Sequence, residues 1–291
     1  MAITPRTSLK NKLITGETIV APGAYDPMGA RIIQDLGFSA IYTGGYMSGA
    51  HLAVTEPLMT MTEQLEVAGR VANSVNLPVI VDGNAGFGDP LHTRRTVLAY
   101  EMAGIAGIHI EDQVYPKRAS YHKGLEHIVP IAEFIEKMSH ALEARQNDDF
   151  VIIGRTDGFS AVGGSMGEAI LRGKALRDLG VDVVMPRGVR EKHDLIKYRE
   201  EVIDVPLLVI AGSDDISVKE YEDMGYQIII YAPTPVVATS RALEHTYRTL
   251  KETGLTGISA SEVAARRTKI EELIDLPEYY RIEEQTTELD N

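Results

Sequence analysis

The chain has 291 residues, 44% of them hydrophobic, and its 29 Lys and Arg residues against 42 Asp and Glu residues give a net charge of −13. This length allows one large domain or two modest ones. The acidic balance repels phosphate backbones and anionic lipid, so we expect no nucleic-acid or membrane partner. No stretch offers the roughly 18 consecutive apolar residues that would span a bilayer. We therefore expect a soluble, cytoplasmic protein, without disulfides or thiolate metal sites because cysteine is absent.

Short apolar runs rich in β-branched residues recur eight times along the chain. Both the odd and the even positions of each run are apolar, which is typical of parallel strands covered on both faces. The runs cover residues 18–26, 39–45, 78–84, 107–112, 150–157, 181–187, 206–212 and 227–234.

Longer stretches with apolar residues at i, i+3 and i+4 lie between these runs and predict helices. They cover residues 63–75, 91–104, 131–146, 167–180, 217–225 and 235–254. Glycines stand where a helix end needs a positive φ, at Gly37, Gly104, Gly180, Gly225 and Gly254.

Eight strand–helix units in about 250 residues predict an α/β fold, a (β/α)₈ TIM barrel, over residues 1–254. A doubly wound sheet is the alternative for any such alternation. Residues 255–291 fall outside the pattern and predict a C-terminal helical appendage of the same domain, with a serine cap and one amphipathic helix. This appendage either docks on its own barrel or exchanges with a neighbouring subunit.

Barrel enzymes build their sites at the carboxyl ends of the strands. Asp82 and Glu111 end adjacent predicted strands, where two ionised carboxylates would repel each other unless a cation lay between them. Oxygen ligands without cysteine or histidine favour Mg²⁺ or Mn²⁺ over zinc. The alternative is a helix-capping role or a salt bridge for each acid.

Three further features accompany these acids. Thr43, Gly44 and Gly45 offer consecutive backbone N–H groups that could bind an anionic oxygen, although glycine pairs are also common in turns. Arg155 could clamp a carboxylate in bidentate fashion or pair with loop acids. Residues 113–127 form a basic loop that could close over an anionic substrate or could simply be solvated.

Several separated motifs resemble the isocitrate lyase/phosphoenolpyruvate mutase superfamily. They are APGAYDPMGARIIQDLGF, AIYTGG, PVIVDGNAGFGDP, GIHIEDQVYPKR and FVIIGRTD, in order within residues 10–250. The resemblance implies a barrel that binds Mg²⁺ and a 2-oxo or 2-hydroxy carboxylate. It also implies a homotetramer in which C-terminal helices are swapped between neighbours.

The resemblance also assigns residues. It implies that the metal site is formed by Asp82, Glu111, Asn84 and Glu56. Arg155 corresponds to the arginine that binds the substrate carboxylate, and Lys117 to the lysine of the gating loop. Tyr42, Thr43, Gly44, Gly45 and Asp82 correspond to the substrate-binding residues.

The chain departs from the lyase pattern at five positions. Isocitrate-type lyases have a catalytic cysteine in the loop, and this chain has Ala119 there. Asn84 replaces a metal-site aspartate and Gly44 replaces a serine. Arg187 and Ile210 stand where the lyases have Glu and Asn, so the chain most resembles the oxaloacetate-decarboxylase-like members.

The residues that remain predict a Mg²⁺-dependent lyase for a small 2-oxo- or 2-hydroxy-dicarboxylate. Retro-aldol cleavage or decarboxylation would proceed through a metal-stabilised enolate. Lys117, Tyr121 and Arg155 are the predicted catalytic residues, and the acid in place of the missing thiol could be Tyr121, His122, Lys123 or water. The alternatives are a phosphonopyruvate-type hydrolase or mutase and a catalytically silent carboxylate-binding barrel.

Overall fold

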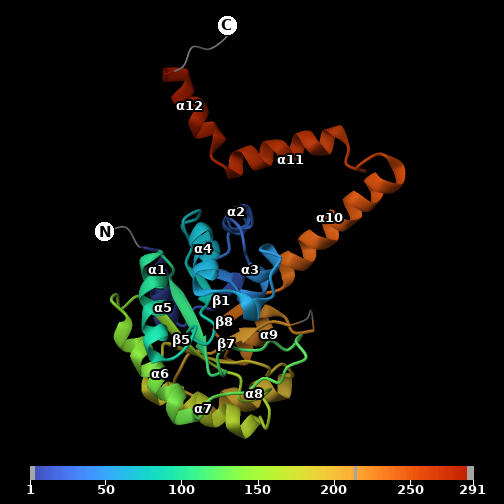
Figure 1. Cartoon of the computed structure of the whole chain (residues 1–291). Helices are drawn as coiled ribbons and strands as arrows, with labels where there is room; N and C mark the ends of the chain where they lie inside the picture. The colour runs from blue at the N-terminus through green and yellow to red at the C-terminus, as the bar shows by residue number, and fades with distance from the viewer. Residues whose placement is uncertain (1–3, 213–214, 287–291) are drawn as a thin grey trace. The chain divides into compact units, whose positions relative to one another are not determined.

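A computed structural model describes residues 4–212 and 215–286 (Figure 1). Its strands are β1 (Ile19–Pro22), β2 (Ile41–Thr43), β3 (Val79–Asp82), β4 (Gly107–Glu111), β5 (Val151–Thr156), β6 (Val183–Pro186), β7 (Leu208–Ile210) and β8 (Ile228–Tyr231). Its first helices are α1 (Pro5–Thr15), α2 (Pro27–Asp35), α3 (Gly45–His51), the short 3₁₀ helix η1 (Glu56–Leu58), α4 (Met61–Ala72), α5 (Pro90–Met102) and α6 (Ile131–Ala144). The remaining helices are α7 (Met166–Leu179), α8 (Lys192–Glu201), α9 (Val218–Asp223), α10 (Thr234–Thr253), α11 (Ala260–Leu273) and α12 (Leu276–Thr286).

The eight strands are all parallel and close into a barrel. Strands β2 to β6 pair in sequence order, and β1 pairs with β8, which pairs with β7. Parallel bridges between Gly23 and Tyr42 and between Val184 and Leu207 join the two groups. Pairing of the first strand with the last excludes the open, doubly wound sheet and confirms the (β/α)₈ barrel.

Packing between strands and helices explains the apolar runs of the sequence. Every residue of β3, β4, β5 and β6 is buried. Gly154 of β5 shows how close the helix layer lies, because a Cβ there would come within 2.5 Å of Leu176 of α7. Strands buried on both faces have no polar side to alternate with.

Helix ends follow the local signals of the sequence. Thr60 and Ser217 form capping boxes at the starts of α4 and α9. All five glycines predicted to need positive φ have values between +72° and +92°. The helical ranges named from the sequence did not include α1, α2, α3 or α8, although Gly37 predicted a helix end just after α2.

Helix α1 covers the end of the barrel where the strands begin. Leu9 is fully buried, and Arg6 donates to the carbonyl oxygen of Ile105, just before β4. Lys10 forms an ion pair with Asp182, just before β6. The amino ends of the strands are therefore closed, and the carboxyl ends are left for a site.

Two compact units divide the chain, residues 1–235 and 236–291. The second unit contains two helices after α10 where the sequence predicted one. Ser259 caps α11 as expected, and Asp275, with a φ of +60°, ends it before α12 begins. No residue of α10, α11 or α12 is buried within the chain. None of the helices in the described residues is both long and apolar enough to cross a membrane.

Candidate active site

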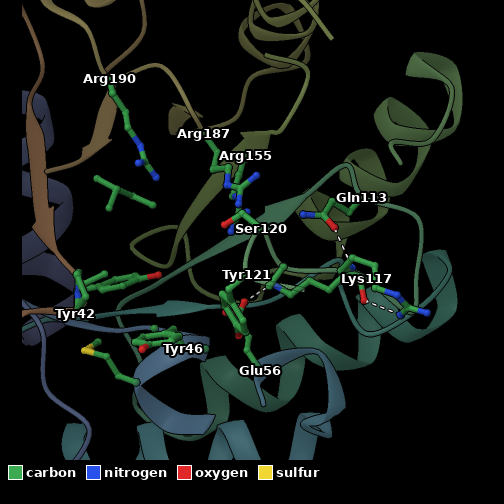
Figure 2. Close-up of a pocket in the computed structure, with 18 residues that line it drawn as sticks. Tyr42, Tyr46, Glu56, Gln113, Lys117, Ser120, Tyr121, Arg155, Arg187 and Arg190 are labelled. Carbon is green, nitrogen blue, oxygen red and sulfur yellow. Dashed lines mark hydrogen bonds and ion pairs between the residues drawn. The ribbon is translucent and has the colours of Figure 1, made fainter. Parts of the chain in front are cut away.

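A pocket of about 300 Å³ opens at the carboxyl ends of the strands (Figure 2). The segment after β2 forms one wall with Tyr42, Gly44 and Gly45. The loop after β4 forms another wall, from Gln113 to Tyr121, and Arg155 at the end of β5 lies between them. This is the end of the barrel at which the sequence predicted a site.

Asp82, at the end of β3, is held rigidly by backbone groups. Its Oδ1 accepts a hydrogen bond from the Asn84 N–H at 2.8 Å, and its Oδ2 accepts one from the Gly45 N–H at 3.2 Å. Burial alone would raise the pKa of Asp82, but the charges of Lys117, His109 and Arg155 hold it well below its usual value. Asp82 therefore stays ionised next to the pocket.

Glu111 is fully buried at the end of β4 and pairs in register with Arg155. Its Oε2 lies 2.7 Å from Arg155 Nη1, and its Oε1 lies 3.0 Å from Lys117 Nζ. Within residues 4–212 and 215–286, neither oxygen has a hydrogen-bond partner of good geometry. Burial raises the pKa of Glu111 to about 7, and these two cations only partly offset the effect. A buried carboxylate in this state has capacity for a further positive partner.

Lys117 comes from the loop and reaches between two acids. Its ammonium lies 2.5 Å from Glu56 Oε1 as well as 3.0 Å from Glu111, and the side chain is only 2% exposed. Burial would lower the pKa of Lys117, but Asp82, Glu111 and Glu56 raise it above its usual value. The charged lysine thus balances the acids around it.

The acids and Gly45 approach one another closely enough to bound a small cavity of about 10 Å³, room for about one water molecule or ion. Glu56, Asp82 and Asn84 line it. A Cβ at Gly45 would come within 2.8 Å of Glu56 and 3.0 Å of Asp82, so only glycine leaves this space open. Across residues 4–212 and 215–286, no three His, Asp or Glu side chains are already arranged as a complete metal site.

Glu56, Asp82, Glu111 and Asn84 offer carboxylate and amide oxygens, which are the ligand type that a hard dication prefers. Glu56 and Glu111 form ion pairs with Lys117, and the charge of Asp82 raises the pKa of that lysine. Asn84 is the exception in orientation, since its side-chain oxygen already accepts a hydrogen bond from the Ala85 N–H at 2.7 Å.

Tyr42 lies in the pocket wall and is fixed by a residue that the sequence did not single out. Its hydroxyl is 2.9 Å from Nε2 of the buried His109. Burial lowers the pKa of His109 to about 4, so the imidazole is neutral at physiological pH. His109 and Glu111 are two residues apart on β4, so their side chains point to the same face of the strand. This spacing was a usable signal that His109 faces the barrel interior.

Two predicted substrate contacts are used within the protein instead. Thr43 is fully buried and does not line the pocket, and its hydroxyl donates to the Ala24 carbonyl at 2.9 Å. The Gly45 N–H donates to Asp82, so it is not free for a ligand. Side chains alternate along a strand, and therefore Tyr42 and Thr43 cannot both face the barrel interior.

Arg155 is held by acids yet keeps capacity for a ligand. Nε and Nη2 donate to Asp157 at 2.9 and 3.0 Å, and Nη1 lies beside Glu111. A guanidinium has five N–H donors, so two remain beyond these three contacts. The pairing of Arg155 with neighbouring acids is confirmed, and its binding of a substrate carboxylate stays a prediction.

The loop after β4 places Ala119 and Tyr121 in the pocket wall. Ala119 is buried and has no acidic group to offer, as the sequence indicated. Tyr121 is half exposed and packs edge to face on Tyr46. Burial raises the pKa of Tyr121, so its phenol keeps its proton at neutral pH.

The chain matches the phosphoenolpyruvate phosphomutase family over residues 9–251. It is 34% identical to the probable 2-methylisocitrate lyase 2 of Corynebacterium glutamicum, over 96% of this chain and 91% of that protein. The chain belongs to the isocitrate lyase/phosphoenolpyruvate mutase superfamily.

Other members of this superfamily agree with the match. The 2,3-dimethylmalate lyase of Eubacterium barkeri is 35% identical over 84% of this chain and 85% of its own. The solved structure of an oxaloacetate acetylhydrolase in complex with the inhibitor 3,3-difluorooxalacetate has a TM-score of 0.88 and 28% identity, covering 99% of both chains. The two curated relatives described here are both lyases, and this chain is a carbon–carbon lyase.

Proposed function

We propose that this protein is a Mg²⁺-dependent or Mn²⁺-dependent lyase that cleaves a carbon–carbon bond of a small 2-oxo- or 2-hydroxy-dicarboxylate. The observation that supports it best is the position of Lys117 at the edge of the pocket, where its ammonium pairs with Glu56 and Glu111 and the charge of Asp82 acts on it as well. Three acids, ionised or partly ionised, in a buried setting need positive charge nearby, and a dication supplies more than one lysine does.

Asp82, Glu111 and Glu56 would hold the ion, with Asn84 as the fourth predicted donor. When bound, the ion supplies positive charge that stabilises negative charge on the substrate's 2-oxo oxygen, worth several kcal/mol in the transition state. Because Lys117 occupies the position between Glu56 and Glu111, the ion and the ammonium compete for the same carboxylates.

Arg155 binds the carboxylate next to the reacting carbonyl through its remaining N–H donors. The loop that contains Lys117 covers the pocket and limits the access of water to it. Tyr121 donates the proton that the carbon atom requires after the bond breaks, in place of the cysteine that isocitrate-type lyases use. Its protonated phenol at the pocket wall supports this role.

The homotetramer with swapped C-terminal helices is part of the proposal. Apolar side chains remain exposed on α10, α11 and α12, among them Leu243, Val263 and Tyr279. Exposed apolar faces of helices are stabilised by packing on another surface. The cytoplasmic location and the domain boundary at residue 254 stay predictions.

The test is a substrate panel with Mg²⁺ and with chelator. We expect metal-dependent release of carbon–carbon cleavage products from at least one of oxaloacetate, isocitrate, methylisocitrate and dimethylmalate. Release of phosphate or a rearranged product from phosphonopyruvate alone would instead favour phosphonate chemistry. Thermal stabilisation by these ligands without any product would favour a silent binding barrel.

A further inference from the structure

The pocket is unusually cationic for so acidic a chain. Its wall contains a single acidic side chain, Glu56, among the residues that line it. Its cationic lining residues are Lys117, Arg118, Arg155, Arg187 and Arg190. An excess of positive charge in a cavity favours an anionic ligand.

Four of these cations are already engaged by the protein. Lys117 and Arg155 pair with the buried acids described above. Arg118 donates to the Lys117 carbonyl at 3.1 Å. Arg187 forms a two-pronged ion pair with Glu126, at 2.7 and 3.2 Å, which ties the loop to the end of β6.

Arg190 is different. In the part of the chain that the structure describes, no hydrogen bond or ion pair engages its guanidinium, and the side chain is exposed at the pocket wall. Figure 2 shows Arg190 entering the pocket from the side opposite Lys117, above Tyr42. An arginine without a partner in a cavity presents a planar fork of donors that matches a carboxylate.

We propose that Arg190 binds the second carboxylate of the substrate, the one farther from Asp82 and Glu111, and thereby selects dicarboxylates over monocarboxylates. This inference rests on the proposed function, because it assumes that the 2-oxo end of the ligand lies at the acids and Arg155. The pocket volume of about 300 Å³ suits a small diacid between these two ends.

The neighbouring wall agrees with this role. Ile210 lines the same pocket as Arg190 and has no polar group in its side chain. Arg187 already forms an ion pair with Glu126. Among the described residues, Arg190 is therefore the cation at this end whose whole guanidinium is unengaged. Its removal leaves no buried acid unpaired, so the fold should tolerate substitution.

The test compares a 2-oxo diacid with a 2-oxo monoacid that lacks the distal carboxylate. Calorimetry with the full-length protein and Mg²⁺ measures the Kd of 3,3-difluorooxaloacetate, which has two carboxylates, and of 2-oxobutanoate, which has a methyl group at the distal end. In Arg190→Gln we expect the Kd of the diacid to rise at least about tenfold. The Kd of 2-oxobutanoate should change less than about twofold, since it never contacts Arg190.

Lys192→Gln is the matched control, because Lys192 is an exposed cation two residues away that pairs with Glu220. It should leave both Kd values unchanged. An unchanged diacid Kd in Arg190→Gln, or equal weakening of both ligands, would overturn the role of Arg190 while leaving the proposed function standing. If the wild-type protein binds neither ligand, the proposed function fails, and this inference fails with it.

Discussion

The ring of Tyr42 lies over the α-carbon of Gly44. A Cβ at position 44 would come within 2.7 Å of Tyr42 Cε1 and 3.1 Å of its hydroxyl oxygen. The hydroxyl is itself held by His109 at 2.9 Å, so a displacement of the ring would break this contact. Gly44 and Tyr42 are therefore one unit, and the glycine that replaces the serine of isocitrate-type lyases permits this position of the tyrosine.

Gly44→Ser tests this unit. The serine would displace the Tyr42 ring and break its bond to His109, and we expect kcat/KM to fall at least about tenfold. Steady-state kinetics measures the loss. Gly69→Ser in α4 is the control, because a Cβ at Gly69 meets nothing within 4 Å, and it should keep full activity. Full activity of Gly44→Ser would show that the Tyr42 position is unimportant.

Lys137 of α6 supports the site from behind. Its buried ammonium donates to the carbonyl oxygens of Ala85 at 3.0 Å and Glu111 at 3.2 Å, and so it ties together the segments that follow β3 and β4. Lys137→Met removes both donors and should lower the free energy of unfolding by about 1–3 kcal/mol. Denaturant titration measures this change.

Lys174→Met is the control for Lys137, because Lys174 forms only an exposed ion pair with Glu201 on α8. Exposed pairs contribute little, and we expect a change below about 0.5 kcal/mol. Equal effects of the two substitutions would contradict a supporting role for Lys137.

Arg155→Lys keeps the positive charge but loses the planar guanidinium with its several N–H donors. A lysine cannot contact Asp157, Glu111 and a ligand in one plane, so we expect KM to rise at least about tenfold. Arg145→Lys makes the same change at the opposite end of the barrel, where Arg145 pairs with Asp182, and should leave KM unchanged. An unchanged KM in Arg155→Lys would refute its contact with substrate.

Much of the fold follows from local sequence. Strands buried on both faces must be continuous apolar runs, and that pattern located all eight. The helix ends at glycines with positive φ could also be predicted from the local sequence. Helix α1 was missed because its buried residues, Leu9 and Leu13, give almost no amphipathic pattern.

The site was predictable only in part. The rule that barrel sites lie at the carboxyl strand ends located Asp82, Glu111 and Arg155. Contacts between distant segments decide the rest. The insertion of Lys117 between Glu56 and Glu111, and the free guanidinium of Arg190, depend on how loops fold back over the barrel. No spacing in the sequence encodes either one.

Asp82 is the residue on which the proposed divalent metal site depends most directly. We would measure Mg²⁺ binding by calorimetry and Mg²⁺-dependent turnover of the best substrate in the wild type, in Asp82→Ala and in Asp178→Ala, an exposed acid on α7. We predict that Asp82→Ala loses both binding and turnover, while Asp178→Ala keeps both. Full metal-dependent activity in a folded Asp82→Ala protein would contradict the account.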